Sequence, residues 1–171
     1  MGVVYKKGEG ITNRDSSPRV LSDGSIDGGV IKEVVGVVDL AVADSTSSQL
    51  RFFRVPSNAR VSSLKLYAPD LGTTTAMNIG LWAESTADTT GTAVDADFFA
   101  SDFSCSAVMA GTDVVHEADT TPGFNILRAE KMIWEVLGLS SDPGTYYDVV
   151  GQLSGASDGT GALCAKMQFV I

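Results

Sequence analysis

A period-two alternation of apolar and polar residues runs through much of the chain and predicts β-strands. The clearest example is residues 76–82, AMNIGLW, in which Met77, Ile79 and Leu81 fall on one face of the strand. Similar short runs, bounded by Gly, Pro, Ser and Asp, occupy residues 34–44, 49–55, 60–68, 103–111, 145–153 and 162–171. The pattern therefore predicts roughly six to eight short strands.

The parity of each run predicts which side chains face the protein interior. In residues 34–44, Val38, Leu40 and Val42 share the inward face. The inward positions of the last run are Leu163, Ala165, Met167, Phe169 and Ile171. Cys164, which lies between two of them, falls on the more polar face.

One longer segment departs from this period and predicts a helix. In residues 124–138, FNILRAEKMIWEVLG, Ile126, Ile133 and Leu137 have helical spacing, and Gly138 is positioned to end the helix.

Residues 95–101, DADFFAS, predict a second, very short helix. Asp95 would cap its N-terminus, and Phe98 and Phe99 would enter the core. Calcium binding by Asp95 and Asp97 is the alternative, but the segment lacks the glycine and glutamate of an EF-hand loop.

The turns between the runs indicate how the strands connect. Residues 132–153 hold the densest apolar material, with an Asp-Pro-Gly turn at 142–144, and SGASDGTG at 154–161 is a hairpin signal. The short turns between residues 49 and 82 predict consecutive antiparallel pairing. We therefore predict an all-β fold: an antiparallel β-sandwich, jelly-roll-like, with one or two short helices.

The first 33 residues lack this patterning and predict an extended N-terminal arm, followed by one sandwich domain at 34–171. Gly, Ser, Asp and Pro occur throughout the arm, which therefore buries too little apolar surface to order itself. We expect a partner surface to order it. Its candidate partner-binding residues are the basic side chains Lys6, Lys7, Arg14 and Arg19.

The charge of the chain is concentrated in its central third. The formal net charge is −9, and nine acidic residues but no Lys or Arg lie between Lys65 and Arg128. Such a segment repels phosphate backbones, so we expect no nucleic-acid partner. No apolar run is long enough to span a membrane, so we expect no membrane partner either. Cys105 and Cys164 are expected to be separate reduced thiols.

No constellation of residues predicts catalysis or a cofactor. His116, the only histidine, has no nucleophile motif near it, so we interpret it as a solvated loop residue. Trp82 and Trp134 would be able to stack on sugar rings if exposed, but their apolar neighbours favour the core. We predict no enzyme, no metal and no cofactor.

Several segments, taken in order, resemble the capsid decoration proteins of tailed phages, also called cement or head auxiliary proteins. The matching segments are RFFRVPSNARVSSLKLYAPDLGTTTAMNIGLW, DADFFAS and IWEVLGLSSDPGTYYDVV, followed by a short closing hairpin. The resemblance covers roughly residues 34–171.

The resemblance implies a non-enzymatic, jelly-roll-like structural protein of the virion. Such a protein binds the outer surface of the icosahedral head, bridges subunits of the major capsid protein and forms a homodimer or homotrimer. It implies a location on the capsid surface, after assembly in the host cytoplasm. A carbohydrate-binding or receptor-binding module of a phage tail or fibre is the alternative, and an enzyme using His116 ranks last.

Overall fold

The computed structural model describes residues 29–42, 44–85, 91–117 and 123–171. Of the first 28 residues it describes Lys7, Ile11, Thr12, residues 15–18 and Val20. The chain divides into two units, Met1–Val30 and Ile31–Ile171, which are described separately.

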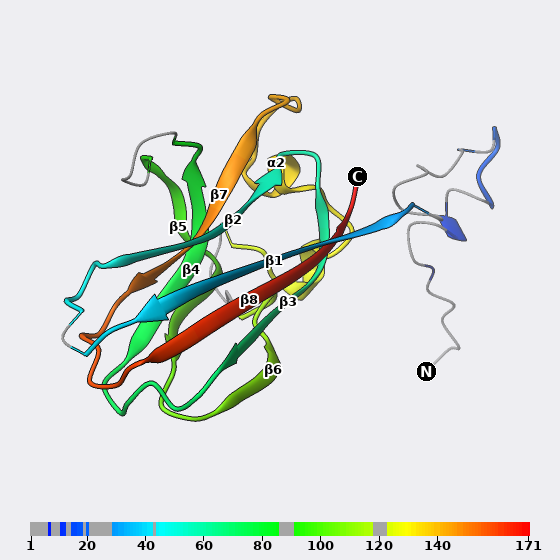
Figure 1. Ribbon diagram of the computed structural model, residues 1–171. Coiled ribbons are helices and arrows are strands. Elements are labelled where there is room, and N and C mark those ends of the chain that lie inside the picture. Colours follow the sequence, from blue (N-terminus) through cyan, green and yellow to red (C-terminus); the bar gives the residue numbers. More distant parts are fainter. Residues whose placement is uncertain are drawn as a thin grey trace, which may run out of the picture. The chain divides into compact units, whose positions relative to one another are not determined.

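Within the described residues of the second unit, eight strands form two four-stranded antiparallel sheets (Figure 1). The first sheet has the order β1 (Ile31–Leu40), β8 (Gly161–Val170), β3 (Arg60–Ala68) and β6 (Met109–Asp113). The second sheet has the order β2 (Gln49–Pro56), β7 (Tyr146–Leu153), β4 (Ala76–Ala83) and β5 (Ala93–Ser104). The predicted all-β antiparallel sandwich is confirmed.

The predicted connections between the strands are wrong. Strands β2, β3 and β4 alternate between the two sheets, and residues 154–161 join β7 of the second sheet to β8 of the first instead of closing a hairpin. A strand with one buried face has the same sequence pattern whether the next strand pairs with it in the same sheet or packs against it in the opposite sheet. Turn length alone therefore does not decide which strands pair. The strand order is compatible with a jelly roll.

The core lies between the sheets and contains most of the predicted inward side chains. Met77, Ile79 and Leu81 are fully buried, as are the inward positions of β8 except at its end. Val42 and Ile171 were wrongly predicted to face inward: β1 ends at Leu40 and β8 at Val170, and both side chains are exposed. Side chains alternate between the two faces only within a strand, so alternation does not predict the orientation of residues beyond its end.

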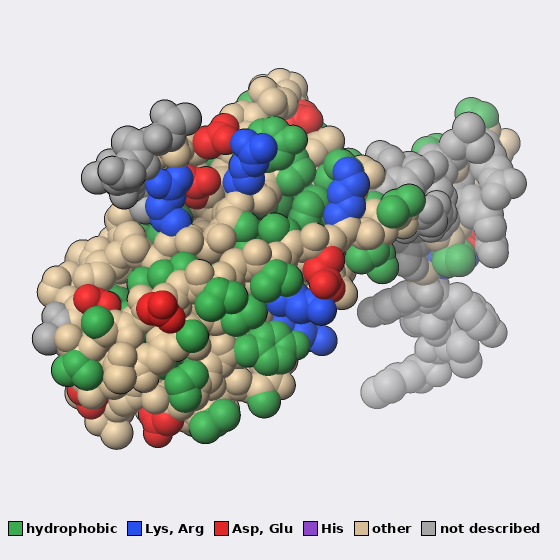
Figure 2. Space-filling view, viewed as in Figure 1, with side chains coloured by type: hydrophobic (Ala, Val, Ile, Leu, Met, Phe, Trp, Pro, Cys, Tyr) green, Lys and Arg blue, Asp and Glu red, His purple; other side chains and the backbone are tan. Residues whose placement is uncertain are grey.

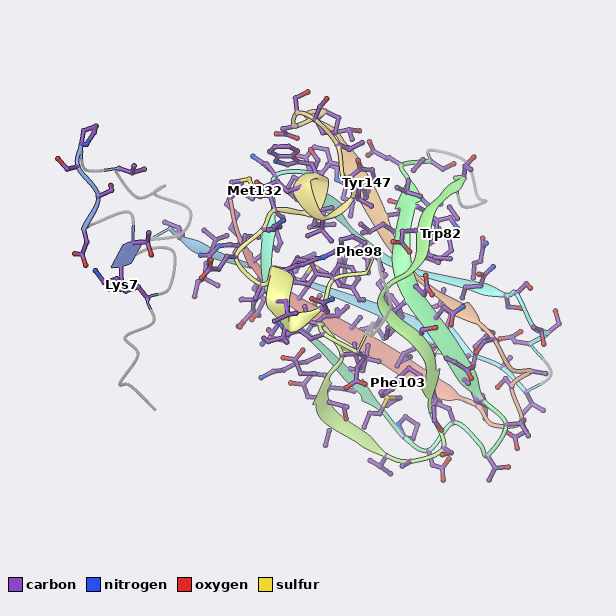
Figure 3. All side chains as sticks on the ribbon, turned by 180° about the vertical axis from the view of Figure 1, so that it is seen from behind. Lys7, Trp82, Phe98, Phe103, Met132 and Tyr147 are labelled. Carbon is purple, nitrogen blue, oxygen red and sulfur yellow. The ribbon has the colours of Figure 1, made fainter. Side chains whose placement is uncertain are left out.

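Residues 95–101 belong to strand β5, so the predicted capped helix is wrong. Leu81 lies opposite Asp95 and Ile79 opposite Ala100, which leaves β5 with a bulge of three extra residues. The bulge turns two consecutive rings inward, and the burial of Phe98 and Phe99 is confirmed. Figure 3 labels Phe98 in this interior.

The phenylalanine cluster joins β5 to the segment that follows β6. The Phe98 and Phe99 rings meet edge to face at 4.9 Å between centroids, and the Phe124 ring lies 5.8 and 6.0 Å from them. Two adjacent buried aromatic residues interrupt strand alternation, and for this reason the segment resembled a helix turn in sequence.

The predicted helix over residues 124–138 is also wrong. It is replaced by a 3₁₀ turn at Ile126–Arg128 and one turn of α-helix, α2 (Ile133–Val136). The backbone N–H groups of Ile133 and Trp134 donate to the carbonyls of Ala59 and Ser57, so tertiary contacts replace the helical bonds these groups would make. Gly138, with φ of 74°, follows α2, as predicted for a helix end.

Candidate interaction surfaces

The four basic residues predicted to bind a partner lie in the first unit. Lys6, Arg14 and Arg19 are outside the described residues. The Lys7 ammonium forms an ion pair of 2.7 Å with Asp15 of the same unit, and both side chains are substantially exposed. An exposed ion pair of this kind contributes little to stability.

The outer face of the first sheet carries a row of uncharged side chains across all four strands. Val37 lies opposite Cys164, Cys164 opposite Tyr67, and Tyr67 opposite Ala110. Val37 is 61% exposed and Tyr67 38% exposed. We call Val37, Cys164, Tyr67 and Ala110 the central row. Figure 2 shows hydrophobic side chains gathered over β1, β8 and β3.

The outer face of the second sheet has a different character. A cleft of about 400 Å³ lies over β2 and the residues that follow β4. Arg51 pairs with Asp148 at 2.7 Å, and Arg54 pairs with Glu84 at 2.9 Å. Because the cleft neutralises its own charges, it favours no ligand of one charge sign.

Of the two tryptophans that the alternative function would use for sugar stacking, one is buried and the other is partly exposed. Trp82 is 1% exposed, and its burial is confirmed. Trp82 follows the core residue Leu81 in β4, so its side chain lies on the opposite face of the sheet, across from Asp148. It is therefore buried on the outer face of this sheet and does not belong to the core that lies between the two sheets. Trp134, in α2, is half-buried, so its assignment to the core is wrong.

The environment of His116 differs from the solvated loop expected for it. Its ring stacks on Phe124 with centroids 5.4 Å apart, and Nδ1 lies 3.3 Å from the Phe124 carbonyl oxygen. The nearby Asp113 carboxylate accepts from the backbone N–H groups of Leu64 and Val115. The observed contacts of both side chains are therefore with the backbone and with Phe124.

Asp95 and Asp97 lie together in the β5 bulge. Burial, followed by the shared contact with Asp97, raises the pKa of Asp95 from 3.8 to about 6. One Asp95 carboxylate oxygen is buried without a hydrogen-bond partner. Within the described part of the chain, no three His, Cys, Asp or Glu side chains come together to hold a metal ion.

This raised pKa predicts a dependence of stability on pH. Protonated Asp95 favours the fold, so its contribution is complete below about pH 4 and is lost as the pH rises through about 6. After allowance for the partial exposure of the side chain, we expect the loss to be about 1 kcal/mol. Asp95→Asn should flatten the profile of unfolding free energy between pH 4 and 7, measured by urea denaturation. Equal profiles for parent and variant would contradict the assignment.

The cysteines are separate thiols, as predicted. Cys105 is buried, which raises the pKa of its thiol to about 11 and makes it unreactive at neutral pH. Cys164 is half-buried on the outer face of the first sheet. Among the described residues, no helix is long and apolar enough to cross a membrane.

The fold is similar to chains of two solved phage capsids. A chain of the cyanophage Pam1 capsid asymmetric unit matches with a TM-score of 0.53 at 16% identity, covering 92% of this chain and 96% of that one. A chain of the capsid of Ralstonia phage GP4 matches with a TM-score of 0.53 at 10% identity, covering 84% and 86%. The likeness shows the fold. No protein-family model matches the sequence, and no curated protein does.

Proposed function

We propose that this chain is a non-enzymatic structural protein of a tailed-phage virion. It binds the outer surface of the icosahedral head and reinforces the lattice of the major capsid protein. The observation that carries the proposal is the fold shared with two capsid chains over nearly the whole length of each. The proposed partners are the major capsid protein and further copies of this chain, as a dimer or trimer.

The arm is the proposed attachment to the head. It carries the basic residues Lys6, Lys7, Arg14 and Arg19 together with an equal number of acidic residues, whereas the central third of the sequence holds acidic residues and no Lys or Arg, so only the body has an excess of negative charge. In this proposal the arm lies in a groove of the lattice and the acidic loops face solvent. Many weak contacts repeated over a lattice add up through avidity, which resists the pressure of packaged DNA.

Deleting residues 2–30 is expected to abolish head binding while leaving the sandwich folded. Among the residues that the structure describes, every strand begins at or after Ile31, so the deletion removes no described ladder of either sheet. We expect at least about a tenfold loss of binding to expanded, undecorated heads, measured by co-sedimentation. The melting temperature of the truncated protein should stay close to that of the parent.

A full-length variant with Lys6, Lys7, Arg14 and Arg19 all replaced by alanine separates charge from chain length. This variant should bind heads more weakly than the parent. The salt-sensitive part of the binding should be lost, so added salt should weaken the variant's binding less than the parent's. Equal binding by the truncated protein would refute the role of the arm. If the full-length protein does not bind heads at all, the proposed function is wrong.

A further inference from the structure

We infer that a pocket at the start of β3 binds a small carboxylate that carries a branched apolar group. The pocket has a volume of about 310 Å³ and shares none of its described lining residues with the cleft over β2. Four parts of the chain meet in it: the start of β3, the segment after β6, the 3₁₀ turn and the end of β8. We call it the Arg60 pocket. The inference concerns the free protein and does not rest on the proposed function.

The ionisable side chains of the Arg60 pocket present only nitrogen atoms. They are Arg60 and His116, and no acid stands among the described lining residues. In the cleft over β2, by contrast, each arginine is paired with a carboxylate. The second unit as a whole also contains more acidic than basic residues. The Arg60 pocket is therefore a local exception in an acidic body, and it favours an anionic ligand.

The first sheet fixes the position of Arg60. This residue lies opposite Val170 in the pairing of β3 with β8, and β3 then bulges at Ser62. The Ser62 hydroxyl donates to the Gln168 carbonyl oxygen at 3.0 Å, which holds the bulge to β8. A guanidinium carries five N–H donors in a planar fork, so Arg60 can bind a carboxylate in addition to its contacts within the protein.

The imidazole of His116 is held in one orientation by Phe124. The two rings stack with centroids 5.4 Å apart, and Nδ1 lies 3.3 Å from the Phe124 carbonyl oxygen. A carbonyl oxygen only accepts, so Nδ1 carries a proton, and Nε2 of the protonated ring is the donor left for a ligand. Phe124 is itself fixed, because its backbone N–H donates to the Phe98 carbonyl at 2.6 Å. A donor positioned in advance lowers the cost of binding.

The rest of the lining is apolar and selects among anions. Val61 and Val170 are buried, whereas Ile126, in the 3₁₀ turn, is 66% exposed. A branched aliphatic group on the ligand covers the Ile126 side chain and removes apolar surface from water. Phosphate or sulfate leaves this surface uncovered. The volume is near the lower end of the range for ligand pockets, roughly 300–1,000 Å³, so the ligand is small.

Two kinds of molecule carry this chemistry: the C-terminal residue of a peptide chain and a free branched-chain acid. N-acetyl-leucine represents the first, and 3-methylbutanoate represents the second. N-acetyl-leucinamide and 3-methylbutan-1-ol are their uncharged counterparts of nearly the same shape. Comparison within each pair therefore isolates the carboxylate, and comparison between the two acids identifies the source.

Titration of the full-length protein with these four compounds, followed by ¹H–¹⁵N NMR, tests the inference. We expect at least one acid to bind with a Kd of roughly 1 mM and to shift the amide signals of residues around the pocket. Its uncharged counterpart should bind at least about tenfold more weakly. Tighter binding of N-acetyl-leucine assigns the site to a chain terminus, and tighter binding of 3-methylbutanoate assigns it to a free acid.

Substitutions localise the binding. Arg60→Gln and His116→Gln should each weaken binding of the acid at least about tenfold, because each removes a donor to the carboxylate. Arg54→Gln makes the same change of charge as Arg60→Gln in the cleft over β2, and it should leave the affinity within about twofold. The NMR spectrum of each variant also shows whether the protein is folded.

A second matched pair does not depend on any buried contact. Ile126→Glu places a negative charge on an exposed residue that lines the pocket, so it should weaken binding of the acid at least about tenfold. Leu127→Glu adds the same charge at the next residue, which is 90% exposed and is not among the lining residues, and should change the affinity by no more than about twofold.

Three results would overturn the inference. The first is the absence of any shift with either acid up to roughly 20 mM. The second is equal binding of an acid and its uncharged counterpart. The third is binding of the acid that both Arg60→Gln and Ile126→Glu leave unchanged in folded protein. The titrations use free protein without heads, so their outcome is independent of the co-sedimentation experiment.

Discussion

Replacing Phe98 by alanine is expected to lower the free energy of unfolding by about 3–5 kcal/mol. The Phe98 ring is fully buried and touches the rings of Phe99 and Phe124. Removing it leaves a cavity between β5 and the segment before α2. Urea denaturation measures the loss directly.

Phe103, near the end of the same strand, is the matched control. Its side chain is only partly buried against the core, so Phe103→Ala should cost about 1 kcal/mol. A difference of less than about 1 kcal/mol between the two variants would mean that the bulge does not direct Phe98 into the core. The comparison therefore tests the least regular feature of the fold.

Alternation predicted the strands and their inward faces because a buried face imposes its period on each strand separately. It gave Met77, Ile79 and Leu81 correctly for this reason. It could not show which sheet a strand joins, because that depends on contacts far away in sequence. It also failed at Phe98 and Phe99, where the bulge removes the period that the prediction depends on.

The candidate surfaces were predictable only in part. Sequence composition predicts the arm and its four basic residues, and this stays a prediction, since the structure describes only Lys7 of the four. The central row was missed because Val37, Tyr67 and Cys164 come from three strands that are distant in sequence. Of the three, only Cys164 was assigned to a more polar face, and only the register aligns them.

The cleft on the second sheet contains two Arg–carboxylate pairs that differ mainly in burial. In the first pair, the Arg51 and Asp148 side chains are 31% and 9% exposed. In the second, the Arg54 and Glu84 side chains are 62% and 38% exposed. Arg51 also donates to the Ser85 carbonyl oxygen at 2.8 Å, so it ties β2 both to β7 and to the segment after β4.

Arg51→Met is expected to destabilise the protein by about 2–3 kcal/mol, because it leaves the buried Asp148 carboxylate without its cation. Arg54→Met removes an exposed pair and a cation–π contact of 4.7 Å with Tyr146, so it should cost less than about 1 kcal/mol. Chemical denaturation of both variants at one pH gives the comparison.

A second substitution identifies the cause of the larger loss. In the Arg51→Met background, Asp148→Asn removes the unpaired charge and should recover part of the stability, whereas lost packing of the arginine stem would not be recovered. Without such recovery, the loss belongs to the hydrogen bond with Ser85 and to packing. Salt should weaken the exposed Arg54–Glu84 contact more than the buried pair, since solvent ions screen the exposed charges and reach the Asp148 side chain far less.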